Sequence, residues 1–172
     1  MRFSGCAFRA HDPRWSFSPL SGQGAAITGG RFNPKHQAAL YLALDPMTAI
    51  LEVTQGFSNR LHPLLLCEYD VDCEDIADLC DADIRAKIGV SFDDMACAWL
   101  IEQRANRVAP SHSISATLYA QGFAGALVPS FAPGAQSGNR NLVLWRWGTD
   151  LSHRVTVFDP TNRLPNDQTS WR

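Results

Sequence analysis

The sequence lacks the long apolar run that a membrane-spanning helix requires. No apolar stretch in its 172 residues approaches the roughly 20 that cross a bilayer, and the start, MRFSGCAFRAHD, is too polar for a signal peptide. The five cysteines are scattered and form no Cys-x-x-Cys pair, which indicates reduced thiols. We therefore expect a soluble, cytoplasmic protein without a membrane partner.

The chain also lacks a large excess of positive or negative charge. The chain carries 15 basic and 17 acidic residues, a net charge of −2, and has no basic stripe. Direct binding of nucleic acid is not expected, and a nuclease is disfavoured. The five histidines are isolated, and the acidic run over residues 72–83 lacks EF-hand spacing, so no metal site is expected either. A P-loop, Gly-x-Gly-x-x-Gly, His-Glu-x-x-His and Gly-x-Ser-x-Gly are all absent.

What is present is the composition of one globular domain. Hydrophobic residues make up 45% and charged residues 19% of the chain, which is enough for a sizeable core. No repeat, low-complexity tract or linker divides the sequence. We expect one domain over residues 1–172, with 160–172 as a polar tail.

Apolar patterns bounded by turn residues predict six strands. They cover residues 2–10, 39–44, 63–71, 125–129, 142–147 and 153–159. The loop over residues 11–24 contains Trp15 and Phe17, which indicates that it packs down on the domain, over a site if one lies there. With the helices described next, this pattern is typical of an α+β domain in which helices are inserted among mostly antiparallel strands.

A helix is expected to begin at Asp45-Pro46, because Asp is a good N-cap and Pro suits the first helical position, and to end at Gly56. Its predicted core face consists of Met47, Ile50, Leu51 and Thr54. Glu52 is expected on the opposite face with small residues such as Ala49, which leaves room for a ligand beside the carboxylate.

Two further helices are expected over residues 91–107 and 113–121. Ser91 and Asp94 imitate a capping box at the start of the first, and Gly122 stops the second. The core stripe of the first helix would consist of Phe92, Met95, Ala96, Trp99 and Leu100.

The stretch GGRFNP, residues 29–34, is the first candidate for chemistry. Two glycines before Arg31 let the backbone turn and pass close to a ligand. The planar guanidinium of arginine offers a fork of donors that suits phosphate. A tight hairpin with a surface arginine is the alternative, and the motif alone does not separate the two.

Four more residues are candidates, although each has an ordinary explanation. Tyr41 is explained as a core tyrosine with its hydroxyl at the edge, and Glu52 as a surface glutamate. Ser130 and Asn141 suit a turn and the start of a strand. Only their order along the chain makes them informative together.

That order, Arg9, GGRFNP, YLAL, AILEV, VPSF and NLVLW, resembles the RES domain, a family named after arginine, glutamate and serine positions. The resemblance covers residues 9–145. Its most specific part is GGRFNP, with Tyr41 ten residues after Arg31 and Glu52 eleven residues after Tyr41. No family motif is recognised in residues 72–113.

The resemblance implies an ADP-ribosyltransferase-like α+β fold, a split antiparallel β core with inserted helices and an NAD+ cleft. It implies that NAD+ is consumed as a substrate. RES proteins are the toxins of bacterial RES–Xre toxin–antitoxin pairs and inhibit growth. The implied partner is a cognate Xre-type helix-turn-helix antitoxin that blocks the NAD+ site, and any DNA binding would belong to that partner.

The resemblance also implies roles for the candidate residues. Glu52 corresponds to the catalytic glutamate, Arg31 to the arginine that grips the pyrophosphate or the neighbouring ribose, and Tyr41 to the aromatic that stacks on nicotinamide. A carboxylate beside the ribose stabilises the oxocarbenium-like transition state of nicotinamide–ribose cleavage.

Three further positions complete the implied site. Arg9 corresponds to its second arginine. Ser130 and Asn141 would donate hydrogen bonds to, or accept them from, ribose, phosphate or carboxamide.

The expected reaction is cleavage of NAD+ and transfer of ADP-ribose to a cellular target protein. NAD+ hydrolysis or phosphorolysis without a protein acceptor stays open, because the resemblance does not choose between them. A non-catalytic nucleotide-binding module is the alternative from another class.

Overall fold

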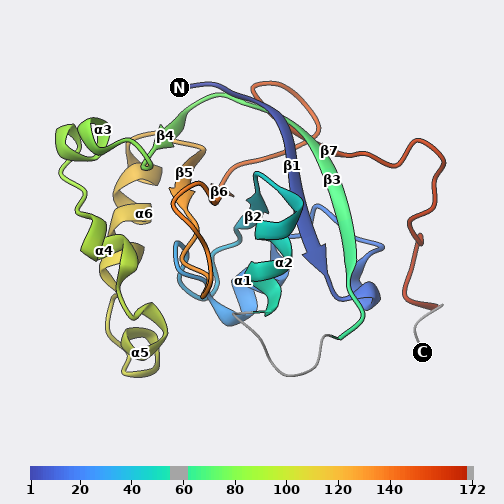
Figure 1. Cartoon of the computed structure of the whole chain (residues 1–172), viewed down its shortest axis with the longest axis horizontal. Helices are drawn as coiled ribbons and strands as arrows, with labels where there is room; N and C mark the ends of the chain where they lie inside the picture. The colour runs from blue at the N-terminus through green and yellow to red at the C-terminus, as the bar shows by residue number, and fades with distance from the viewer. Residues whose placement is uncertain (55–61, 170–172) are drawn as a thin grey trace.

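The computed structural model describes residues 1–54 and 62–169 (Figure 1). The expected helix end at Gly56 and the last residues of the tail lie outside these ranges. Strands and helices occur in separate runs, such as α3 to α6 followed by β5 to β7, and the strands form a mostly antiparallel sheet, which confirms the predicted α+β class. None of the helices within the described ranges is long and apolar enough to span a membrane.

Within the described residues, seven strands form one sheet in the order β4-β5-β6-β2-β1-β3-β7. Their bounds are β1 Phe3–His11, β2 Leu40–Ala43, β3 Leu65–Cys73, β4 Ile76–Asp78, β5 Gly125–Pro129, β6 Arg140–Leu144 and β7 His153–Val157. All neighbouring pairs are antiparallel except β4 and β5. The six predicted strands are confirmed to within a few residues, and β4 is the additional one.

The helices cover one face and one end of the sheet (Figure 1). They are α1 Gln23–Thr28, α2 Pro46–Thr54, α3 Ala82–Lys87, α4 Phe92–Ala96, α5 Trp99–Arg104 and α6 Pro110–Ala120, with a short 3-10 turn, η1 Pro13–Trp15. The expected helices after Asp45 and over 113–121 are present as α2 and α6. The sequence patterns did not indicate α1 or α3.

The sheet has two parts that meet at a weak seam. β1 and β2 are joined in register only at Phe8 and Ala43, whereas β1 pairs with β3 along its whole length. The parts are thus β4-β5-β6-β2 and β1-β3-β7, which is the split core that was expected. The chain then passes over the top of the molecule from β3 directly into β4, so one continuous segment bridges the two parts (Figure 1).

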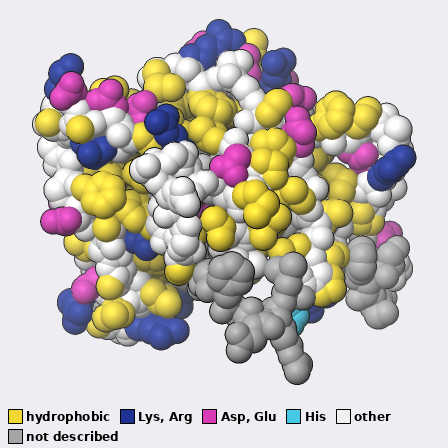
Figure 2. Space-filling view, in the orientation of Figure 1, with side chains coloured by type: hydrophobic (Ala, Val, Ile, Leu, Met, Phe, Trp, Pro, Cys, Tyr) yellow, Lys and Arg dark blue, Asp and Glu magenta, His cyan; other side chains and the backbone are white. Residues whose placement is uncertain are grey.

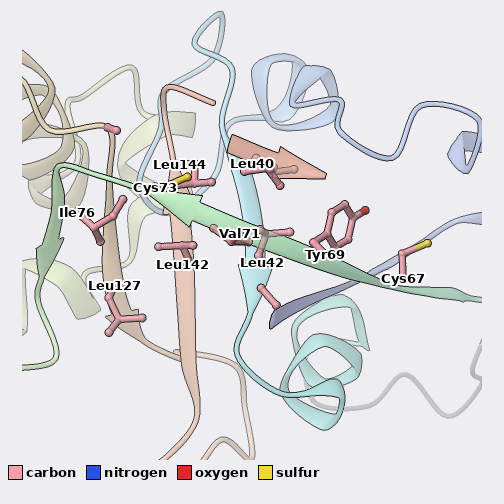
Figure 3. Packing of buried hydrophobic residues seen from close by; sticks show 13 residues of the cluster. Leu40, Leu42, Cys67, Tyr69, Val71, Cys73, Ile76, Leu127, Leu142 and Leu144 are labelled. Atoms are coloured by element: carbon pink, nitrogen blue, oxygen red, sulfur yellow. The ribbon is translucent and has the colours of Figure 1, made fainter. Parts of the chain in front are cut away.

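The two faces of the sheet carry different side chains because successive residues of a strand point to opposite faces. The largest apolar cluster fills one face (Figure 3). On β2, Leu40 and Leu42 belong to this cluster, while Tyr41 packs against a second cluster on the other face, together with residues of α4 and α6. Ala43 also faces away from the first cluster and contributes to a small third cluster beneath α2.

The predicted core face of α2 is wrong. Met47 is 63% exposed, Ile50, Leu51 and Thr54 are only partly buried, and Figure 2 shows apolar side chains on the surface over this helix. The buried residues are Thr48 and Ala49, and Ala49 packs against Ala10 and Ala43 of the sheet. Small side chains on both sides let helix and sheet approach closely. The face that was expected to be outward, the one with Glu52, is therefore the face turned toward the sheet.

The expected helix over 91–107 is interrupted. Cys97 is extended, with φ −53° and ψ 157°, so α4 ends before it and α5 begins after Ala98. The cap is confirmed, since Ser91 Oγ accepts a hydrogen bond of 3.0 Å from the Asp94 amide. The predicted core stripe is wrong in part, because Met95 is fully buried but Phe92 is 49% exposed.

The loop over 11–24 packs on the face of the sheet opposite α2, but not through Trp15 as expected, because Trp15 is 55% exposed. Leu20 packs against the cluster of Figure 3, and its carbonyl accepts a 3.0 Å hydrogen bond from Trp147 Nε1.

Candidate active site

The stretch GGRFNP forms a tight turn with Arg31 near its tip. The Gly30 amide donates to the Asn33 carbonyl at 2.9 Å, and the Asn33 amide donates back at 3.4 Å. Gly29 has φ +75°, which side chains disfavour. A Cβ on Gly30 would lie 2.6 Å from the Tyr41 hydroxyl. Both glycines are therefore required by the turn and its close packing, as the sequence suggested.

Asn33 holds this turn together from the inside. It is fully buried, and its Oδ1 accepts a 2.7 Å hydrogen bond from the Tyr41 hydroxyl. Its Nδ2 donates to three backbone carbonyls, those of Ala25, Pro34 and Gln37. The Tyr41 hydroxyl in turn accepts a 2.9 Å hydrogen bond from the Phe32 amide. These two hydrogen bonds hold the Tyr41 ring to the turn, and burial raises the pKa of its phenol.

The Arg31 side chain is held by the break between α4 and α5. Its Nη1 donates to the carbonyls of Met95 at 3.0 Å and Cys97 at 2.8 Å, and its guanidinium carbon lies 4.5 Å from the centre of the Phe131 ring. Burial lowers the pKa of Arg31, although a guanidinium remains charged. Neither Nε nor Nη2 donates a hydrogen bond to another described residue, so these groups remain available to an anion.

Glu52 is fixed through one of its two oxygens. Ser130 Oγ donates to Oε1 at 2.6 Å and Asn141 Nδ2 donates to the same oxygen at 2.5 Å. No described residue donates to Oε2. Asn141 Oδ1 is buried and accepts no hydrogen bond from the described part of the chain, which is costly unless a ligand or water supplies a donor. The two unpaired acceptors suit a ligand that carries hydroxyl or amide donors.

Arg31, Tyr41 and Glu52 line one cavity, although they come from a turn, a strand and a helix. The other lining residues are Phe32, Val128, Pro129, Phe131, Asn141 and Val143. The cavity volume is about 50 Å³. Typical small-molecule sites measure about 300–1,000 Å³, so this pocket is smaller than the dinucleotide-sized cleft that was expected.

The structure does not bring Arg9 to this cavity. Phe8 pairs with Ala43 on the face beneath α2, so the next residue, Arg9, points to the opposite face. Its Nη1 donates to the carbonyls of Pro19 at 3.1 Å and Ser21 at 3.0 Å. The expectation of a second site arginine at this position needs correction, because a difference of one residue along a strand changes the face.

Comparison with known proteins identifies the family. The family model of the RES domain matches residues 7–167. The chain belongs to the RES domain family. Among solved structures, it is similar to a chain in the crystal structure of the M. tuberculosis MbcT–MbcA toxin–antitoxin complex, with 23% sequence identity and a TM-score of 0.55. The match covers 84% of this chain and 75% of that one and shows a shared fold. No curated protein matches the sequence.

Several residues of this RES domain site were not anticipated from the sequence. Phe131 forms a wall of the cavity under Arg31, and Asn33 orders the turn. Phe131 belongs to VPSF and Asn33 to GGRFNP, but nothing in the local sequence indicates which residues they contact. The carbonyls of Met95 and Cys97 come from the segment in which no family motif was recognised.

A larger groove of about 390 Å³ lies elsewhere on the RES domain, between residues 88–90 and α6. Among the described residues that line it, Asp94 is the one charged residue, and none is an arginine or lysine that could bind phosphate. The small cavity at Glu52 is therefore the better candidate for a dinucleotide substrate.

Proposed function

We propose that this RES domain cleaves NAD+ at the bond between nicotinamide and ribose. The observation that supports it is the convergence of Glu52, Arg31 and Tyr41 on one cavity. A fixed carboxylate, a partly unpaired guanidinium and an aromatic ring suit the developing cation, the pyrophosphate and the nicotinamide of that reaction.

In the proposed reaction the bond between ribose C1′ and the nicotinamide nitrogen breaks, and its electron pair leaves with the nitrogen. Nicotinamide departs as a neutral ring, so no general acid is needed. Positive charge develops on the ribose, and the Glu52 carboxylate stabilises it. The hydrogen bonds of Ser130 and Asn141 to Oε1 hold the carboxylate in place and leave Oε2 for a ribose hydroxyl.

Arg31 would bind the pyrophosphate or the adjoining ribose through Nε and Nη2, while Nη1 keeps its two backbone carbonyls. The Tyr41 ring would lie against the nicotinamide. Because the cavity is small, it receives the reacting end of NAD+, and the adenosine end lies outside it.

The similar solved structure is of a toxin–antitoxin complex, and the RES resemblance implies the same class. The chain would act in the cytoplasm as the toxin of such a pair and transfer ADP-ribose to a cellular protein. An Xre-type helix-turn-helix antitoxin would block the cavity.

Degradation of NAD+ without a protein acceptor is the second candidate, because after nicotinamide leaves, water or phosphate can add to C1′ as well as a protein side chain. Incubation with NAD+ labelled in the adenylate decides between them. Label on a protein band indicates transfer, and free ADP-ribose or its phosphate indicates degradation.

The test of the common step is nicotinamide release by the purified protein. We expect Glu52→Gln to reduce it by about 10²–10³-fold while folding is retained. The matched control is Glu74→Gln, because Glu74 is exposed and its contact with Arg2, at 3.9 Å, contributes little. Undiminished release from Glu52→Gln would exclude the assigned role, and NAD+ binding without any turnover would favour a non-catalytic module.

A further inference from the structure

α2 and the connection between β5 and β6 are joined by two polar contacts, one helical turn apart. The contact at Glu52 belongs to the candidate active site. The other involves Thr48, four residues earlier and thus on the same face of the helix. Thr48 is completely buried, although it does not line the cavity.

The contact at Thr48 is a closed network of hydrogen bonds. Asp45 caps α2 through Oδ1, which accepts a 2.8 Å hydrogen bond from the Thr48 amide, and through Oδ2, which accepts from the Thr48 hydroxyl. Asn139 Nδ2 donates to Thr48 Oγ1 at 2.6 Å. Burial by itself raises the pKa of Asp45, but the hydrogen bonds from Thr48 and Asn139 outweigh it and hold that pKa below its usual value. The network is thus intact at neutral pH.

Asn139 links this network to both residues that hold Glu52. Its backbone carbonyl accepts a 2.9 Å hydrogen bond from the Ser130 amide, and Asn141 follows two residues later along the chain. Its Oδ1 accepts a 2.7 Å hydrogen bond from the Gln136 amide, so the Asn139 side chain also binds another residue of the β5–β6 connection. A shift of Asn139 would therefore move both donors to Glu52 Oε1.

We propose that Asn139 and Thr48 are positioning residues for Glu52. By fixing the β5–β6 connection to the first turn of α2, they place Ser130 and Asn141 so that both donate to one oxygen of Glu52 and leave the other open. Neither Asn139 nor Thr48 lines the cavity, so they act through those donors. The effect on turnover rests on the proposed function, whereas the effect on structure does not.

The kinetic experiment compares Thr48→Val, which keeps the shape but removes the hydroxyl, with Thr48→Ser, which keeps the hydroxyl. We expect kcat for nicotinamide release to fall about 10- to 100-fold in Thr48→Val and in Asn139→Asp, with KM for NAD+ little changed. Thr48→Ser should stay close to the wild type. Equal kcat values for Thr48→Val and Thr48→Ser would overturn the proposal.

To distinguish the positioning of Glu52 from a general effect on stability, Thr48→Val is repeated in a Glu52→Ala background. With no carboxylate left to position, the second substitution should cause no further loss of residual activity. A further loss as large as in the wild-type background would mean that Thr48 acts through general stability, which also overturns the proposal.

Amide hydrogen exchange provides a readout that does not require NAD+ turnover. In Thr48→Val we expect faster exchange at the Ser130 and Gln136 amides, while amides of β3 keep their protection. If the wild-type protein releases no nicotinamide, the proposed function fails and this measurement alone decides the positioning role. Unchanged exchange at both amides would then reject it.

Discussion

Ser130 Oγ lies 2.6 Å from Glu52 Oε1, although the two residues are 78 positions apart in the sequence. Asn141 reaches the same oxygen from 89 positions away. The two oxygens of the Glu52 carboxylate therefore differ, because Oε1 is fixed by the protein and Oε2 accepts no hydrogen bond from a described residue.

Removal of the Ser130 hydroxyl should weaken the hold on Glu52. A hydrogen bond to a charged group contributes about 1.5–3 kcal/mol, so we expect Ser130→Ala to lower nicotinamide release by roughly tenfold or more. Ser130→Thr keeps the hydroxyl and serves as the control. Steady-state assays with both variants check this, and equal rates for alanine and threonine would count against the contact.

Substitution of Arg31 by lysine keeps the charge but loses the planar fork that spans the Met95 and Cys97 carbonyls and stacks on Phe131. We expect KM for NAD+ to rise by about tenfold or more. Arg104→Lys is the matched control, because Arg104 is exposed on α5 and donates to no described side chain. Similar KM values for the two variants would contradict a phosphate-binding role for Arg31.

Gly30→Ala should destabilise the turn, because the added Cβ would lie 2.6 Å from both the Tyr41 hydroxyl and Asn33 Oδ1. We expect a loss of about 1–3 kcal/mol in the free energy of unfolding. Gly24→Ala is the control, since nothing lies within 4 Å of its Cβ position and alanine favours the helix there. Denaturant unfolding measures both, and equal stability of the two variants would show that the turn relaxes.

Arg9→Met should affect stability rather than substrate binding. The variant loses the hydrogen bonds to the Pro19 and Ser21 carbonyls, so we expect the free energy of unfolding to fall by about 1–3 kcal/mol. KM for NAD+ should stay near the wild-type value, since Arg9 points to the other face of the sheet. A large rise in KM without loss of stability would restore Arg9 as a site residue.

His11 should make stability depend on pH. Burial, with the Arg9 guanidinium nearby, lowers the pKa of His11 from 6.5 to about 4. Between these values the unfolded chain binds a proton that the folded chain does not, so stability falls as pH drops through this window, by up to about 3 kcal/mol. The free energy of unfolding, measured at pH 7, 5.5 and 4, should change less with pH for His11→Gln than for the wild type. An equal pH dependence of the free energy of unfolding in the two proteins would show that His11 also binds the proton in the folded state.

The sequence by itself determined the local features of this protein. The Asp45 cap, the Ser91 cap, the glycines of GGRFNP and six strands follow from hydrogen bonds and steric limits between near neighbours, and these act wherever the segment lies. The order of the motifs likewise indicated the family and pointed to Arg31, Tyr41 and Glu52, which line one cavity.

The tertiary structure alone decided which way these elements face. Alanines on β1 and β2 turn the small face of α2, and with it Glu52, toward the sheet. The Arg31 guanidinium binds carbonyls at the break between α4 and α5, and the register at Phe8 sends Arg9 to the far side. Each outcome depends on a partner distant in the sequence, because packing and hydrogen-bond partners are chosen only when the segments meet.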